Sequence, residues 1–246
     1  MHPLSASELL SVWERGGDQT SVQQAMMLLA CASPEISPGY LARLSIGQRD
    51  GFLLTLREWA FGPHLVGMAT CPRCDDRLEF SFEVADIRAT PEREPEPDEE
   101  FSIAVCDYEV AFRLINSQDL LEILDSGDLV SARRILLDRC ILAVSYRGIE
   151  SSLDSLPDSV VNRVAMEMEL LDPQGDLQLS LSCPSCSHRW EAPFDITSFF
   201  WTEIEGWVRH ILRDVHTLAR AYGWRESDIL AMTAKRRLIY MELVDR

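Results

Sequence analysis

Hydrophobic residues in the first 66 positions recur at intervals of three and four, which is typical of amphipathic helices. An apolar stripe at Leu9–Trp13 predicts a first helix, which Gly16–Gly17 ends. A second helix is predicted over Val22–Ala32. A third begins near Ile46 and stops at Gly62–Pro63, because glycine and proline are common at and after a helix C-terminus.

The spacing changes to alternation after this helical region. Apolar and polar residues alternate over residues 78–84, which predicts a half-buried strand. Residues 90–100 (TPEREPEPDEE) then combine three prolines with six acidic side chains and have too few apolar residues to bury a core. We predict an extended, mobile and solvated linker there, with an acidic docking strip as the alternative. Alternation over residues 101–115 suggests a hairpin.

The pattern is helical again over residues 117–172, with one helix starting at Ser117, another over 128–144 and a third over 157–171. A short strand follows over 177–181. Apolar residues at three- and four-residue steps then predict a long helix up to Tyr222. Gly223 stands where a left-handed cap belongs, and two short helices complete the chain.

Two cysteine pairs form a short internal repeat. CPRCDDRLEFSF begins at Cys71, and CPSCSHRWEAPF begins at Cys183. In each copy two thiols stand two residues apart beside a strand, which allows both sulfur atoms to face one ion. Two such loops supply the four ligands that structural zinc prefers, so we predict that Cys71, Cys74, Cys183 and Cys186 bind one structural Zn²⁺.

Three other readings of the four cysteines remain open: a redox pair, disulfides without metal, and iron in a rubredoxin-like site. His188 follows the second pair, but four thiols already complete a zinc shell. Arg77 and Arg189 occupy equivalent positions in the two copies and are candidates to offset the negative charge of the thiolates, or are simply surface arginines. The remaining three cysteines (Cys31, Cys106 and Cys140) are expected to be buried and inert.

Composition narrows the function. The chain has 246 residues, of which 46% are hydrophobic, and its net charge of -17 disfavours nucleic acid as the main ligand. The one dense basic cluster, Lys235–Arg237, is typical of a helix C-terminus. Neither a targeting segment nor an apolar stretch of membrane-spanning length is visible, so we expect a soluble protein of the bacterial cytoplasm. The sequence contains no recognisable catalytic motif, and we expect no enzymatic activity.

These motifs carry a resemblance to a known family. The runs GQRDGFLLTLREWAFGPHL, CPRCDDRLEF, CPSCSHRWEAPFDITSFFW and VHTLARAYGWRESDILAMTAKRRLIYMELV resemble the T-even-phage-type baseplate proteins of contractile phage tails and phage-tail-like injection particles, over residues 1–244. The resemblance implies a structural or assembly role without a reaction. Knuckles of this kind often carry glycine after the second cysteine, where φ tends to be positive; here Asp75 and Ser187 occupy that position.

The expected fold is therefore mostly α with a small β zinc ribbon, in the α+β class. We predict six regions: a helical 1–66, the first half-ribbon 67–88, the linker 89–100, an inserted hairpin with helices 101–176, the second half-ribbon 177–196, and a helical 197–246.

We predict a structural component or assembly factor of a contractile injection baseplate, which contacts other baseplate or hub proteins and is retained in the particle or virion in some cases. The alternative is a zinc-ribbon adaptor for another protein or for nucleic acid. The expected contact surface is the long helix from Thr197 to Tyr222 with the helices after it. Its aromatic side chains exceed what one apolar stripe needs, and the candidates are Phe199, Trp201, Trp207 and Trp224. Packing of Phe199 and Trp201 on the ribbon and N-terminal helices is the alternative.

Overall fold

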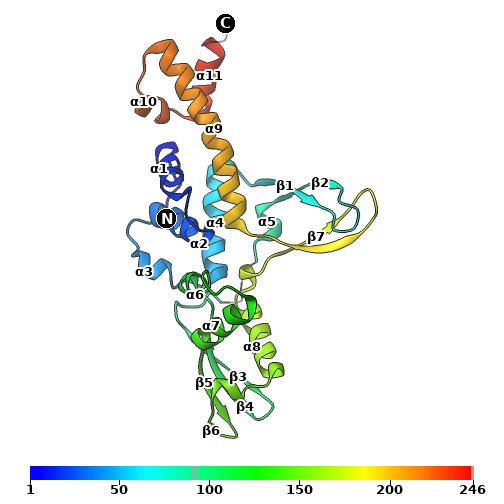
Figure 1. The fold of residues 1–246 in the computed structure, drawn as a ribbon. Coiled ribbons are helices and arrows are strands. Elements are labelled where there is room, and N and C mark those ends of the chain that lie inside the picture. Colours follow the sequence, from blue (N-terminus) through cyan, green and yellow to red (C-terminus); the bar gives the residue numbers. More distant parts are fainter. Residues whose placement is uncertain (90, 92, 245–246) are drawn as a thin grey trace. The chain divides into compact units, whose positions relative to one another are not determined.

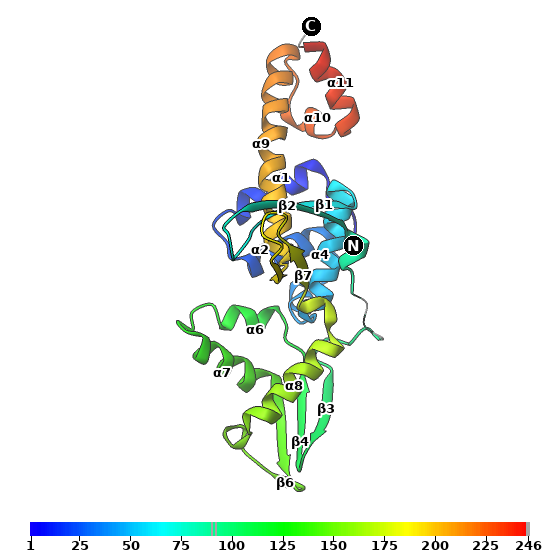
Figure 2. The same cartoon turned by 90° about the vertical axis from the view of Figure 1, so that its right-hand side faces the viewer.

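The computed structural model describes residues 1–246 except 90, 92, 245 and 246 (Figures 1 and 2). The described chain divides into two compact units. The helical unit combines Met1–Glu35 with the residues from Ile196 onward, and the central unit is Ile36–Asp195. Helices and small antiparallel sheets are both present, so the predicted α+β class is confirmed.

Helices from both ends of the chain build the helical unit. They are α1 (Ala6–Gly16), α2 (Ser21–Ala32), α9 (Ile196–Tyr222), α10 (Glu226–Leu230) and α11 (Ala234–Val244). The first two begin with capping boxes. Ser5 and Glu8 satisfy each other's backbone N–H groups at α1, and Thr20 and Gln23 do the same at α2. Gly223 ends α9 with a φ of 68°, as predicted for a left-handed cap.

The core of the helical unit lies along one face of α9. Its buried residues follow the predicted spacing of three and four: Ile196, Phe200, Ile204, Val208, Ile211, Val215 and Leu218. The α1 and α2 helices pack on α9 through a second buried set, Leu9, Leu10, Val12, Leu28 and Leu29. Farther along, Asp214 of α9 accepts a hydrogen bond from the guanidinium of Arg237 at 3.0 Å, which fastens α11 to α9.

The central unit contains a larger set of elements. Its helices are α3 (Pro38–Leu41), α4 (Ile46–Phe61), α5 (Val84–Ile87), α6 (Ser117–Glu122), α7 (Leu129–Cys140) and α8 (Asp158–Leu171), with 3-10 turns at Leu153–Ser155 and Pro173–Gly175. Its strands are β1 (His64–Thr70), β2 (Arg77–Glu83), β3 (Glu100–Val105), β4 (Tyr108–Arg113), β5 (Ile141–Tyr146), β6 (Ile149–Glu150), β7 (Gln178–Ser182) and β8 (Arg189–Pro193). They form a β1–β2 hairpin, a four-stranded β3–β4–β5–β6 sheet and a β7–β8 hairpin.

The four-stranded sheet corrects one prediction. A helix was expected to continue through residue 144, but α7 ends at Cys140 and the chain enters β5. Val144 pairs with Val110 of β4, and both side chains are buried against Val160 and Val164 of α8. The short run ILAVSY suits either structure by periodicity, and pairing with a distant strand decides in favour of β.

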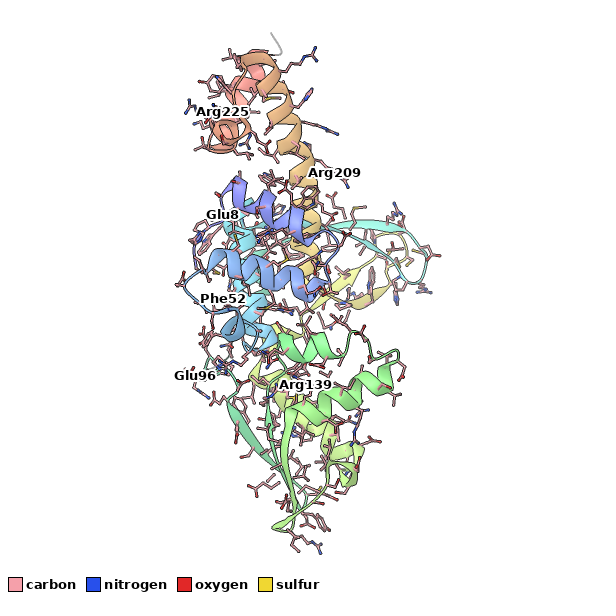
Figure 3. All side chains as sticks on the ribbon, turned by 60° about the vertical axis from the view of Figure 1, so that its left-hand side comes forward. Glu8, Phe52, Glu96, Arg139, Arg209 and Arg225 are labelled. Carbon is pink, nitrogen blue, oxygen red and sulfur yellow. The ribbon has the colours of Figure 1, made fainter. Side chains whose placement is uncertain are left out.

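A buried acidic group joins the sheet to α6 and α7. The carboxylate of Asp119 has no exposed surface and accepts two hydrogen bonds from Arg113 of β4, at 2.6 and 2.7 Å. It accepts a third from Arg139 of α7, at 2.7 Å, and a fourth from the backbone N–H of Asn116 (Arg139 is labelled in Figure 3). Burial opposes ionisation, but these donors hold the pKa of Asp119 below its ordinary value.

The helix α4 belongs to the central unit, whereas the sequence pattern predicted that residues 1–66 form one helical region. Contacts at the N-terminus of α4 explain why it joins the central unit. Asp172, just after α8, accepts a hydrogen bond from the Ser45 hydroxyl and another from the backbone N–H of Gly47, both at 2.8 Å. Orphan N–H groups at a helix start need such acceptors. The division therefore falls between Glu35 and Ile36.

Much of the described acidic segment is exposed, in keeping with the predicted solvated linker. The side chains that face solvent are Arg93, Glu94, Glu96, Asp98 and Glu100. The segment nevertheless contacts the start of α4 and the residues before it at two points. Pro95 is buried, and its carbonyl oxygen accepts a hydrogen bond from the Gln48 side chain at 2.8 Å. Asp98 forms an ion pair of 3.1 Å with Arg43. The predicted linker also includes Thr90 and Glu92, which lie outside the described residues.

Candidate metal centre

The two cysteine repeats form equivalent hairpin tips. The first pair lies between β1 and β2, where Thr70 pairs with Arg77, and the second lies between β7 and β8, where Ser182 pairs with Arg189. All four strands belong to the central unit. Figure 1 shows both hairpins extending in one direction from the rest of that unit.

The same backbone hydrogen bonds shape both tips. In the first, the N–H of Asp75 donates to the carbonyl of Cys71 at 3.0 Å, and the N–H of Cys71 donates to Asp76 at 2.9 Å. The second tip repeats both bonds at 2.9 Å, from Ser187 to Cys183 and from Cys183 to His188. Each turn places its two thiols on one side.

The residue after the second cysteine has a left-handed backbone conformation in both tips. Asp75 and Ser187 each have a φ of 57°. The positive φ expected at this position from the sequence is therefore observed, with a non-glycine residue adopting it in each copy. Side chains disfavour this region. The turn is thus held by its own hydrogen bonds rather than by glycine.

The four sulfur atoms converge on one point. Their ligand atoms all lie within 4.8 Å of one another, and the Sγ–Sγ separations are 3.7 Å for Cys71 and Cys186 and 3.6 Å for Cys74 and Cys183. A tetrahedron with Zn–S bonds of about 2.3 Å has S–S edges of about 3.8 Å. A disulfide needs about 2.05 Å. The spacing therefore fits a tetrahedral metal ion and not a bonded pair.

The centre is enclosed on one side and open on the other. Cys71 and Cys183 are 0% and 1% exposed and pack with Leu78, whereas Cys74 is exposed to solvent. Ala69, Cys186 and Trp190 cover this small core in part. An ion can therefore enter past Cys74. Four thiolates would complete the coordination shell of such an ion, which is the arrangement of structural zinc sites.

The surroundings of Cys183 and Cys74 shift the pKa values of their thiols in opposite directions. Backbone N–H groups of Cys186 and Ser185 donate to Cys183 and lower the pKa of that thiol to about 7. At Cys74 the backbone N–H of Asp76 acts in the same direction, but hydrogen bonds shared with the neighbouring sulfurs outweigh it and raise the pKa to about 12. A thiol with such a pKa ionises only with a cation beside it, which a metal ion supplies.

The residues near the cysteines take other roles. The His188 ring stacks on Trp190, with 5.9 Å between centroids and 8° between planes. Arg77 and Arg189 are exposed at the first residues of β2 and β8. The sequence did not reveal a hydrogen bond that joins the two tips directly, from the Ser185 hydroxyl to the Asp76 carboxylate. No spacing rule signals that pair, since it forms only once the tips meet.

The predicted contact residues of the helical unit differ in burial. Trp201 is 6% exposed, and a Cβ atom on Gly16 of α1 would lie 2.4 Å from its ring. Trp201 is thus a core residue, and the alternative of packing on the N-terminal helices holds for it. Phe199 and Trp207 are partly buried. Trp224 stacks on Tyr222 at 4.4 Å between centroids and meets Tyr240 edge-on at 4.8 Å.

The other cysteines follow their prediction only in part. Cys140 is buried, and burial raises the pKa of its thiol to about 12. Cys31 is partly buried. Cys106 is exposed, so the prediction of a buried thiol is wrong there. It occupies the turn between β3 and β4 with a φ of 55°, where its apolar sequence neighbours belong to the strands.

The fold and the site together define an α+β protein in which two hairpins meet at a four-thiol centre suited to a structural metal ion. The family described as T4 bacteriophage base plate protein matches residues 5–201, a range that includes both hairpins and all four cysteines. The chain belongs to this family, and the resemblance identified from its motifs is confirmed. The match ends at Trp201, so the C-terminal motif from Tyr222 lies outside it.

No curated protein and no solved structure gives a significant match to the chain. Within the described residues, no helix combines the length and the apolar character needed to cross a membrane.

Proposed function

We propose that the protein is a non-enzymatic structural component or assembly factor of the baseplate of a contractile injection system or phage tail, and that one Zn²⁺ held by its four cysteines maintains its central unit. The observation that carries the proposal is the family match over residues 5–201, which spans both halves of the cysteine centre. The geometry of the four sulfur atoms supports a tetrahedral metal site, and zinc is the ion that structural four-thiolate sites prefer.

Zinc has a structural role in this proposal. Cys74 and Cys183 stand 109 positions apart, and everything between them belongs to the central unit. Small hairpins have little core of their own. The bound ion supplies the missing stability, since sites of this kind contribute on the order of 10–16 kcal/mol in zinc-finger peptides. With all four coordination positions filled by thiolates, no position remains for a catalytic water.

Contact with other baseplate or hub proteins is the activity that follows. Partly buried aromatic side chains are frequent anchors of protein interfaces. In the helical unit Phe199, Trp207 and Trp224 are the candidates, and Trp201 is withdrawn from that role by its burial. The net charge of -17 favours partners with basic surfaces over nucleic acid.

The second candidate function is a zinc-ribbon adaptor that joins proteins of an unrelated assembly. The exposed side of the cysteine centre at Cys74 and the exposed arginines Arg77 and Arg189 favour this alternative. Both functions require the zinc site. They differ in the particle to which the protein belongs.

Deletion and complementation test the proposal. A strain without the gene is expected to produce few complete contractile particles in electron micrographs, and the wild-type gene is expected to restore them. A Trp207→Ala, Trp224→Ala double variant that keeps its zinc should restore them poorly. Trp59→Ala removes an exposed tryptophan of the central unit and serves as the matched control. Normal particles in the deletion strain contradict the baseplate role and favour the adaptor.

A further inference from the structure

A groove of about 630 Å³ lies between the β1–β2 hairpin and the β7–β8 hairpin. One wall consists of residues 78–82 of β2, and the opposite wall consists of residues 177–182, mainly β7. Successive side chains of a strand point to opposite faces. If one face of a sheet formed a wall, only every second residue would line the groove. Consecutive residues line it instead, so each wall is the hydrogen-bonding edge of a strand.

Hydrogen bonding shows which backbone groups of β2 face the groove. The N–H of Val84 donates to the carbonyl of Pro63 at 2.9 Å, at the open end of the β1–β2 hairpin. Hydrogen-bonded and non-bonded pairs alternate along an antiparallel ladder. The backbone N–H and C=O groups of Glu79 and Ser81 therefore turn away from β1 and toward the groove.

The same reasoning applies to β7. The N–H of Phe194 donates to the carbonyl of Leu177 at 2.9 Å, so the next pairs bonded to β8 are those of Leu179 and Leu181. The backbone groups of Ser180 and its alternate neighbours in β7 point away from β8. Each hairpin is a separate two-stranded sheet among the described residues, so these edge groups have no partner strand there.

The two edges suit one additional strand. The hairpin tips meet at the cysteines, where β2 begins and β7 ends, so the two strands run in opposite directions along the groove. A strand inserted between them runs antiparallel to one and parallel to the other. It spans about 17 Å if it pairs with the five residues of β7 at about 3.3 Å per residue.

We infer that the groove binds an extended, basic segment of a partner protein, which adds one strand between β2 and β7 and joins the two hairpins into a single sheet. Backbone pairing of this kind gives affinity, and alternate side chains give specificity. Unpaired edges attract additional strands in general. This inference rests on the proposed function, because the groove keeps its shape only if a zinc ion holds the two hairpin tips together.

The charged side chains that line the groove indicate the charge of the segment that binds there. Three charged side chains line the groove, and two are already engaged: Arg88 pairs with Glu58 at 3.6 Å, and Asp86 accepts the backbone N–H of Glu83 at 2.9 Å. Glu79 has no ion pair among the described residues. A second copy of this chain brings its own net charge of -17 and is repelled, whereas a basic segment is attracted.

The faces of the two strands indicate the pattern of that segment. Leu78, Phe80, Leu179 and Leu181 are buried or partly buried toward the side that holds the small cysteine core. Glu79, Ser81 and Ser180 are exposed on the other side. A matching strand alternates apolar residues, which extend the first side, with lysine or arginine, which face Glu79.

The test uses the zinc-loaded full-length protein and a fluorescein-labelled decapeptide of alternating lysine and valine. The anisotropy of the label should rise on binding, and a glutamate–valine decapeptide should bind far more weakly. Hydrogen exchange of the Ser81 and Ser180 amides should slow in the complex. The Ser81→Pro variant removes one outward N–H and should bind about tenfold more weakly, the equivalent of one hydrogen bond.

Val66→Pro is the matched control, because Val66 lies directly opposite Ser81 and presents its N–H on the far edge of the same hairpin. It should bind within about twofold of wild type, since proline is tolerated where an edge N–H faces solvent. If Ser81→Pro loses zinc, Glu79→Lys serves in its place: it keeps the backbone intact and should reverse the preference between the two peptides.

Four results overturn the inference. Three of them are absence of binding by the lysine peptide, equal binding by folded Ser81→Pro, and equal binding of both peptides. Concentration-dependent self-association that Ser81→Pro abolishes assigns the groove to a second copy instead. These outcomes are separate from the proposed function, because particle formation is measured in the deletion strain and peptide binding is measured with the isolated protein.

Discussion

The carboxylate of Asp172 accepts a hydrogen bond from the backbone N–H of Gly47, 125 positions earlier in the chain, at 2.8 Å. The approach is so close that a Cβ atom on Gly47 would lie 2.1 Å from a carboxylate oxygen of Asp172 and 2.9 Å from the backbone nitrogen of Gly175. The absence of a side chain at position 47 thus allows the α4 N-terminus to dock on the turn after α8.

Gly47→Ala should therefore destabilise the protein by about 1–3 kcal/mol, the usual cost of forcing extra atoms into a packed site. Gly51→Ala is the control, because it lies in the same helix and its Cβ would meet nothing within 4 Å. That change should stabilise by about 0.5–1 kcal/mol, since alanine loses less entropy in a helix. Urea unfolding measures both. Equal stabilities of the two variants would contradict the importance of the close approach.

The second prediction concerns the metal. Protein purified under reducing conditions should contain about one zinc ion per chain, as four thiolate ligands complete one shell. Cys71→Ser and Cys183→Ser should each lose the ion and the order of both hairpins, because removing one ligand leaves the others without their cross-link. Cys106→Ser changes an exposed thiol outside the centre and should keep the zinc. Elemental analysis and circular dichroism measure the two effects. Wild-type protein with free thiols and no metal would refute the prediction.

The third prediction is a pH dependence that arises at Asp50. Burial raises the pKa of its carboxyl from 3.8 to about 6, in spite of the Arg49 guanidinium 2.7 Å away. The folded state then holds a proton that the unfolded state releases between about pH 4 and pH 6. The free energy of unfolding should fall as pH rises through this window, by at most about 3 kcal/mol.

Asp50→Asn cannot ionise, so the difference in stability between it and the wild type should change across that pH window and stay constant above it. Unfolding by urea at intervals from pH 4 to pH 7 measures the difference, and comparison at equal pH cancels the titration of the cysteines. Asp125→Asn removes an exposed carboxyl of the same unit and should show no such change. A difference in stability between Asp50→Asn and the wild type that stays constant across this window would rule out Asp50 as a source of the pH dependence.

The fourth prediction tests the burial of Trp201. A Cβ atom on Gly16 would lie 2.4 Å from the indole ring, whereas one on the adjacent Gly17 would come no closer than 3.9 Å to any atom. Gly16→Ala should destabilise the protein by about 1–3 kcal/mol, and Gly17→Ala should be nearly neutral. Thermal unfolding of the pair distinguishes them. Should Gly16→Ala unfold at the wild-type temperature, Trp201 is free to move away and is available for an interface after all.

Local patterns in the sequence were sufficient to predict the cysteine centre. Two thiols separated by two residues beside a strand specify a ligand pair, and the repeat at Cys183 indicates that a second pair meets the first. The helices α1, α2 and α9 were similarly predictable, because their apolar spacing and capping residues act within one or two turns. Membership of the baseplate family also followed from these local motifs.

Features that depend on distant contacts were not predictable. The run from Ile141 to Tyr146 becomes a strand because Val144 finds Val110, and its periodicity alone does not indicate this partner. Pro95 is buried and its carbonyl accepts a hydrogen bond from Gln48, 47 positions away, although its neighbours in sequence are acidic. Likewise, the sequence around Phe200 contains more aromatic residues than one apolar helix face can bury, which suggested that Trp201 is free to contact a partner protein. Its packing partner, Gly16, lies 185 positions earlier in the chain and is not apparent from the local pattern.

The composition of the helical unit has a consequence for its synthesis. The helices α1 and α2 leave the ribosome before α9, and the α9 face that they cover is separated from them by residues 36–195. At about 5–20 residues per second, a nascent chain needs on the order of 8–30 s to make those 160 residues. During this delay Leu28, Leu29 and their neighbours lack their partner helix. The α1 and α2 helices can therefore complete their packing only after residues 36–195 have been made, and in the interval they are exposed to binding by a chaperone.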